Sequence, residues 1–149
     1  MADVLQAETA QAALQALLSG IDGLPECRRN DRRLREFDSN GFLLAMSDGD
    51  RETDDVESGE PPQYEVYVTA EVQLVLEGEP GAPRDAIFAA AEWKLAQTLW
   101  ADRTLGGACE HFELSGGVER LHPFSEGGKP CEVLRFELAM LITADTPFG

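Results

Sequence analysis

Cysteine and histidine are the most chemically versatile side chains of this sequence, and one of each lies close together in it. Cys109 and His111 are two positions apart, so on a strand their side chains would share one face, and Cys131 could lie on the neighbouring strand. Such a group could form a thiolate–imidazole pair or part of a metal site. No fourth ligand is apparent, and the alternative is a surface histidine beside unreactive thiols.

Catalytic and cofactor-binding motifs are missing from the sequence. It contains two histidines and no G-x-S-x-G, H-E-x-x-H, Walker or dinucleotide-binding glycine pattern. Three widely spaced cysteines, the third being Cys27, indicate neither a disulfide framework nor a zinc ribbon. We therefore expect no catalytic residues, no metal and no cofactor.

Carboxylates are the most abundant charged groups. Twelve Lys and Arg stand against 28 Asp and Glu, a net charge of −16, and this field repels phosphate and anionic membranes. Alternation predicts that Glu65, Glu71, Glu77 and Glu137 point outward from two strands. They form either an ordinary solvated sheet face or an acidic surface that faces a specific partner.

Positive charge is concentrated in one short segment. Five of the twelve basic residues fall within eight positions, namely Arg28, Arg29, Arg32, Arg33 and Arg35. Nucleic acid is one possible counterpart, but the net charge favours an acidic protein surface. Residues 48–60 of a neighbouring copy would supply such a surface, which makes the two segments candidate halves of a head-to-tail interface between subunits.

Two tryptophans mark a second apolar stripe on a predicted helix. Trp93 and Trp100 are seven residues apart and are interleaved with Ala89 and Ala96. The stripe is either the edge of the core or an anchor for a partner, a role in which tryptophan is enriched.

The elements that position these residues follow from hydrophobic periodicity. We treat the 149 residues as a single domain, since this length supports one sizeable core. Helical spacing predicts helices over 3–19 and 82–101, and alternation predicts strands over 64–77, 110–114 and 131–143, with a weaker strand over 42–46. Residues 48–62 are rich in acids, glycines and prolines and are expected to form a mobile acidic loop, and 116–130 is expected to be a long connection.

The apolar faces of these elements indicate the architecture. The first helix carries apolar residues at helical spacing: Val4, Leu5, Leu14, Leu17, Leu18 and Ile21. The second would pack through Ile87, Phe88, Ala91, Leu95 and Leu99. In the short strand, Phe112 and Leu114 would face inward. One-sided alternation predicts a two-layer α+β sandwich: a mostly antiparallel sheet with both helices packed on one face. No apolar run approaches the ~18 residues of a membrane helix and no secretory signal is apparent, so we expect synthesis in the cytoplasm and no membrane partner.

A resemblance enters at the turn after the second helix. That helix ends in Leu99-Trp100-Ala101 and is followed by Asp102-Arg103-Thr104-Leu105-Gly106-Gly107, and the last strand runs into Thr143-Ala144-Asp145-Thr146-Pro147-Phe148. Residues 64–148 resemble the tail terminator family of long-tailed bacteriophages, the lambda minor tail protein U-like and related tail completion proteins.

The resemblance implies a structural, non-enzymatic protein without a cofactor. It would form a homo-oligomeric ring, a hexamer, on the head-proximal end of the tail tube, end tube polymerisation and join the tail to the head connector or stopper protein. It would be assembled in the host cytoplasm and end in the virion at the head–tail junction. DNA would pass through the ring without specific binding, which acidic walls favour by like-charge repulsion.

The turn residues would then be structural. Asp102 and Thr104 would accept backbone N–H groups through their side-chain oxygens, Gly106 and Gly107 would adopt positive φ, and Leu105 would pin the turn to the core.

Two other interpretations of the sequence stay open. One is another ring-forming head–tail adaptor or tail tube subunit. The other is a small α+β binding module or enzyme unrelated to phages that uses Cys109, His111 and Glu113 as its site.

Overall fold

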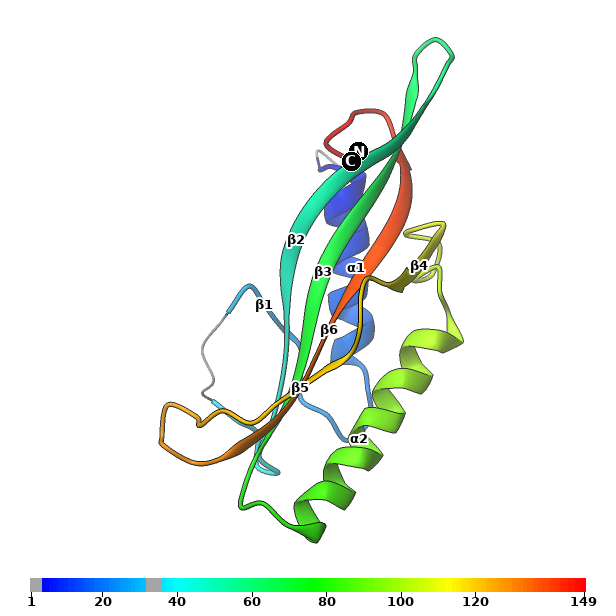
Figure 1. The fold of residues 1–149 in the computed structure, drawn as a ribbon. Helices are drawn as coiled ribbons and strands as arrows, with labels where there is room; N and C mark the ends of the chain where they lie inside the picture. The colour runs from blue at the N-terminus through cyan, green and yellow to red at the C-terminus, as the bar shows by residue number, and fades with distance from the viewer. Residues whose placement is uncertain (1–3, 32–35) are drawn as a thin grey trace.

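A computed structural model describes residues 4–31 and 36–149 (Figure 1). Two helices and six strands follow one another as α1 (Gln6–Ser19), β1 (Arg28–Arg29), β2 (Phe42–Glu57), β3 (Gln63–Glu77), α2 (Ala82–Ala101), β4 (His111–Leu114), β5 (Glu119–Leu121) and β6 (Cys131–Ala144). The two helices pack against one face of the sheet, so the predicted α+β sandwich is confirmed.

The sheet is antiparallel except at one edge. Its strand order is β1-β2-β3-β6-β4, and β5 pairs with β6 farther along the edge that β4 occupies. The central pair, β3 and β6, is matched from Tyr64 opposite Ala144 to Glu77 opposite Cys131. Only the two-residue β1 runs parallel to its neighbour, β2.

Side chains from both helices and one face of the sheet form the main core. The inward members on the two central strands are Val66, Val68, Ala70, Val72, Leu74, Leu134, Phe136, Leu138, Met140 and Ile142. Helix α2 adds Phe88, Ala91, Leu95 and Leu99, which recur at the three- and four-residue spacing of one helical face. These faces agree with the predicted ones.

Four predicted core positions are wrong. Ile87 is 52% exposed, because it lies about 100° around the helix from Phe88. Val4 and Leu5 are exposed because α1 begins only at Gln6, after them. Leu114 is 38% exposed at the end of the edge strand β4, whereas Phe112 is fully buried.

The acidic segment predicted as a mobile loop at 48–62 is mostly strand, so that prediction is wrong. Strand β2 continues to Glu57, and residues 58–62 alone form the turn to β3. The reason is the neighbouring strand. Because β3 pairs with β6 as far as Tyr64, its other edge offers backbone hydrogen-bonding groups to β2 along the same length. Backbone pairing needs no apolar side chains, and the acids point into solvent. We call the exposed hairpin over 50–63 the acidic arm.

The arm starts at an irregularity in β2. Pairing shifts between Asp48 and Arg51, and a Cβ atom added to Gly49 would lie 2.3 Å from the hydroxyl oxygen of Thr69. Only glycine fits this close approach of two strands.

A second, smaller core lies on the opposite face of the sheet. Leu43, Val75, Val133 and Cys131 are buried there and are covered by partly buried Phe37 and Leu121. Leu121 belongs to β5, which falls within the segment predicted to be only a long connection. No helix in the described part of the chain is both long and apolar enough to cross a membrane.

Candidate functional site

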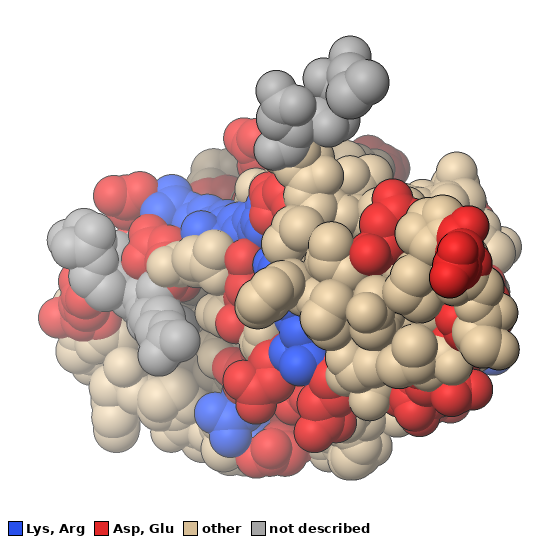
Figure 2. All heavy atoms as spheres, turned by 90° about the horizontal axis from the view of Figure 1, so that it is seen from above, with Lys and Arg blue, Asp and Glu red and all other residues tan. Residues whose placement is uncertain are grey.

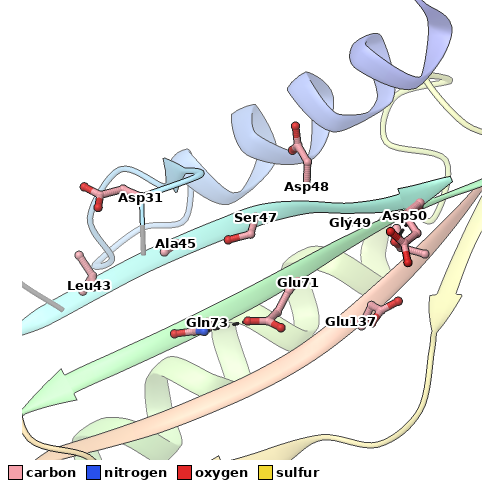
Figure 3. A pocket seen from close by; sticks show the side chains of 11 residues that line it. Asp31, Leu43, Ala45, Ser47, Asp48, Gly49, Asp50, Glu71, Gln73 and Glu137 are labelled. Atoms are coloured by element: carbon pink, nitrogen blue, oxygen red, sulfur yellow. Dashed lines mark hydrogen bonds between the residues drawn. The ribbon is translucent and has the colours of Figure 1, made fainter. Parts of the chain in front are cut away.

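The face of the sheet opposite the helices carries opposed carboxylates near its middle. Glu71 on β3 lies directly across from Glu137 on β6, and Ser47 on β2 lies on the other side of Glu71. Together with Asp50 they line an open hollow of about 330 Å³ (Figure 3). Gln73 Nε2 donates a 2.8 Å hydrogen bond to Glu71 Oε1. The partner of this carboxylate in the hollow is therefore a neutral amide.

Like charges also gather toward the arm. The pKa of Glu65 is raised, first by partial desolvation and then by the carboxylates of Glu57 and Asp55. The pKa of Tyr67 is raised in the same way, with Glu113 as the largest charged contributor. Seen from the end that carries the arm, Lys and Arg side chains are few and lie beside Asp or Glu (Figure 2). The end of the molecule that carries the arm therefore has a negative potential.

The predicted acidic face is only partly one surface. Glu65, Glu71 and Glu137 share the open face, as alternation indicated. Glu77 lies at the far end of β3, opposite Cys131 and about 20 Å along the strand from Glu71. The small core around Val75 separates it from the other three.

The described arginines of the basic segment are already paired within the chain. Arg29 donates to both oxygens of Asp48 at 2.9 Å and to both oxygens of Glu8 at 2.8 and 2.6 Å. Arg28 pairs with Asp31 and Glu36. Arg29 thus joins β1, β2 and α1, and its partner Asp48 is the first residue of the segment assigned to a neighbouring copy. Arg32, Arg33 and Arg35 lie outside the described residues.

The pKa shifts agree with this clamp. The hydrogen bond from Arg29 lowers the pKa of Glu8. For Asp48, desolvation is the largest influence and raises the pKa, but hydrogen bonds from Arg29 and Asn30 together lower it below the ordinary value. The pKa of the Arg29 guanidinium is raised by the same two carboxylates. Arg29 is therefore bound as a permanent cation that holds three elements together.

The turn after α2 has the predicted geometry. Asp102 accepts the backbone N–H of Thr104 at 3.0 Å and of Gly106 at 2.7 Å, and the Thr104 hydroxyl accepts that of Gly107 at 3.2 Å. The Thr104 hydroxyl, followed by these backbone donors, lowers the pKa of Asp102. Gly106 and Gly107 have φ of 69° and 92°, and Leu105, at 53°, shares the left-handed conformation while remaining 7% exposed.

Cys109, His111 and Cys131 do not form a site. Strand β4 begins at His111, so Cys109 belongs to the preceding turn and packs in the helix-side core, whereas His111 and Glu113 flank the inward Phe112 on the other face. Cys131 lies about 30 Å along β6 from Leu141, the residue opposite His111. Among the described residues, no group of three His, Cys, Asp or Glu side chains could hold a metal ion.

Burial also makes the thiols unreactive. It raises the pKa of Cys27 to about 12 and that of Cys109 to about 11. Burial is also the largest cause of the raised pKa of Cys131. A protonated, buried thiol is a poor nucleophile and a poor metal ligand. The site built on Cys109, His111 and Glu113 is therefore not assembled in this fold.

The tryptophan stripe lies on the surface. Trp93 is 65% exposed and Trp100 is 42% exposed, and the Trp100 ring meets Phe112 edge-on at 5.4 Å between centroids. Beside them, α2 and the β4–β5 edge enclose an apolar groove of about 150 Å³ whose rim includes Leu114 and Val118. Sequence reasoning left core and interface equally open for this stripe and did not connect it to the β4–β5 edge.

Sequence reasoning also missed a buried carboxylate. Glu132, with 8% of its side chain exposed, accepts Arg84 at 3.3 Å and Arg120 at 3.2 Å, and His122 Nε2 lies 2.9 Å from it. The cluster fastens the start of α2 to β5 and β6. Its members are far apart in sequence, so no local pattern could have indicated it.

Comparison with known proteins gives no further assignment. No protein-family model matches the chain, and a search of curated proteins finds no significant match.

Proposed function

We propose that this chain is the subunit of a ring that ends a phage tail tube at its head-proximal end and joins it to the head connector. The ring is a hexamer on the model of the tail terminators that the sequence resembles, and it acts without catalysis or a cofactor. Its partners are further copies of itself, the tail tube protein and the head connector or stopper protein. Its place is the head–tail junction of a virion assembled in the host cytoplasm.

The observation that carries the proposal is the acidic sheet face. Helices cover one side of the sheet, while the other side presents Glu65, Glu71 and Glu137 without helical cover. A channel for DNA must not retain phosphates, and a wall of fixed negative charge meets that need because it repels them at short range. In the proposed ring this face lines the channel.

Two further features support the proposal. A ring needs two different patches on each subunit, one to meet the next copy and one to meet the previous copy. The sheet offers two different edges: β2 beyond the short β1 on one side, and β4 with β5 on the other. The turn over 102–107, the specific element of the resemblance, also has the backbone hydrogen bonds to Asp102 that its sequence predicts.

The same surfaces would serve a tail tube subunit or another head–tail adaptor. These proteins also need a channel that does not bind DNA, so the acidic face does not separate them from a terminator. Polymerisation separates them, because a tube subunit adds copies without limit and a terminator stops after one ring.

Solution mass tests the proposal directly. Light scattering of the purified protein, alone and with tail tubes from the same particle, should show a closed oligomer, or a monomer that joins tubes at one end and halts their growth. Long cylinders would indicate a tube subunit instead. A monomer that leaves tube length unchanged would refute the proposal.

Charge reversal tests the assignment of the acidic face. Glu71→Lys with Glu137→Lys keeps like charges opposite each other but turns the centre of the face basic. Assembled rings of this variant should retain a DNA duplex that the wild type does not bind. Glu79→Lys with Glu126→Lys makes the same charge change at two exposed turn residues and is the matched control. Equal DNA retention by both variants would contradict the lumen assignment.

A further inference from the structure

Helix α2 is apolar on both sides. Its buried side faces the sheet. Among the more exposed positions of α2, the polar residues are Asp85, Lys94 and Gln97, while Arg84, Glu92 and Thr98 are partly exposed. The other exposed positions are Ala82, Pro83, Ala86, Ile87, Ala89, Ala90, Trp93, Ala96, Trp100 and Ala101. A surface helix normally carries charged side chains toward water, and a helix that is apolar all round is normally covered.

Large and small side chains alternate along one edge of this exposed side. Ala89, Trp93, Ala96 and Trp100 follow at spacings of four, three and four residues, which is the repeat of a helix–helix seam. We call these four residues the tryptophan seam. All four are exposed, and Trp93 is the most exposed large apolar side chain on α2, at 65%.

We infer that the tryptophan seam binds the same seam of a second copy of this chain, with the two α2 helices antiparallel. When the two-fold axis passes between positions 94 and 95, Trp93 faces Ala96 of the second copy and Trp100 faces its Ala89. Each large side chain then meets a small one, as in knobs-into-holes packing. The seam is thus complementary to itself, which is the requirement for an isologous contact.

The tryptophan seam is a part of the surface where two copies can approach without opposed charges. A chain of net charge −16 repels its own copies over most of its surface. The seam is uncharged, and the nearest carboxylate, Glu92, is paired with Arg120 of the same chain. In the antiparallel arrangement Glu92 faces Gln97 of the second copy, so no carboxylate opposes another.

The exposed area sets the strength of the contact. Trp93 and Trp100, with Leu114 and Val118 at the neighbouring groove, are 65%, 42%, 38% and 49% exposed. They offer about 400 Å² per copy, half of the ~800 Å² that each partner contributes to a standard interface. An interface of this size belongs with weak, transient contacts, so we expect a dimer that forms only at high protein concentration. This pairing goes beyond the proposed ring and does not depend on it.

Analytical ultracentrifugation over a series of protein concentrations tests the pairing. If the species seen at low concentration is a monomer, its mass should rise toward twice the starting value. If it is a ring, its mass should rise with concentration, because each subunit of the ring carries a seam. Trp93 and Trp100 are the only tryptophans of the chain, so the blue shift of emission that accompanies doubling reports on the seam alone. Ala96→Glu should abolish both changes. Ala90→Glu, the same substitution at an exposed position of α2 outside the seam, should leave both intact.

Three results would overturn the inference. One is a mass that stays constant up to about 1 mM. Another is doubling that survives Ala96→Glu in a variant with the wild-type circular dichroism spectrum. The third is a blue shift that needs added tail tubes and occurs without doubling, which would assign the seam to a different protein. A ring whose mass does not rise with concentration would refute the pairing and leave the proposed function standing.

Discussion

Replacing Arg29 with methionine should destabilise the fold more than the same replacement of its neighbour Arg28. The Arg29 side chain is 16% exposed and donates to both carboxylate oxygens of Glu8 and of Asp48, at 2.6–2.9 Å. Methionine keeps an unbranched stem for packing against the same neighbours but removes every donor. Two carboxylates from α1 and β2 then lose the cation between them.

The magnitude follows from hydrogen bonding and exposure. Four charge-assisted hydrogen bonds at about 1.5–3 kcal/mol each set an upper bound, but water recovers much of this because the side chains of Glu8 and Asp48 are 41% and 29% exposed. We expect a loss of about 2–3 kcal/mol in the free energy of unfolding. For a chain of this size that corresponds to a fall of about 5–10 °C in Tm.

Urea unfolding followed by circular dichroism at two protein concentrations measures the loss separately from any dissociation of subunits. Arg28→Met is the control, since Arg28 is twice as exposed and its pairs are worth about 0.5–1 kcal/mol. Glu8 and Asp48 have lowered pKa values in the folded state, so their contribution is present above about pH 4 and is lost as pH falls through the folded values. The difference between wild type and Arg29→Met should shrink there. A loss below about 1 kcal/mol, or one equal to that of Arg28→Met, would refute the clamp.

Two other substitutions and one labelling experiment also have defined expected results. Leu105→Asp should unfold the subunit rather than selectively block assembly, because it places a charge in a site that is 7% exposed; a folded, monomeric variant in a light-scattering and circular dichroism assay would contradict this. Charge reversal of the three arginines over 32–35 should weaken assembly without unfolding, and an unchanged oligomer size across moderate salt would count against that interface. Cys27 and Cys109, with pKa values raised by burial to about 12 and about 11, should not react with a thiol reagent at pH 8 until urea unfolds the chain; rapid labelling of the native protein would disprove their burial.

The elements that could be predicted are those in which the spacing of apolar side chains reflects the burial of one face. Residues 64–77 and 131–143 alternate because one face of β3 and β6 is buried, and the bounds of α2 are the predicted 82–101. The outer half of β2 buries nothing, so its strand structure depends on pairing with β3 and leaves no hydrophobic pattern. Strands β1 and β5, of two and three residues, are too short to show any period.

The predictions about candidate sites were right or wrong for similar reasons. Alternation placed Glu65, Glu71 and Glu137 correctly, but the separation of Glu77 depends on Phe37 and Leu121, which come from outside the two strands. The partners of Arg29 are 19 and 21 residues away in sequence and could not be read locally. Cys109 was assigned to the face of His111 on the assumption of a strand.

That assumption failed because the strand begins too late. The turn over 102–107 contains three consecutive residues with positive φ, and regular pairing resumes only at His111. Period-two reasoning therefore does not extend back to Cys109.

The carboxylates of this chain act on folding with opposite signs. Glu8 and Asp48 have lowered pKa values because the half-buried cation of Arg29 binds them, so their ionisation stabilises the fold. Glu65 has a raised pKa, because folding partly desolvates it and brings Glu57 and Asp55 close, so its ionisation opposes the fold. Glu71 faces Glu137 across neighbouring strands and has an amide for a partner. Folding alone accounts for the first pair of acids. Folding does not account for the acids of the open face, and the proposed role of that face in repelling phosphate would account for them.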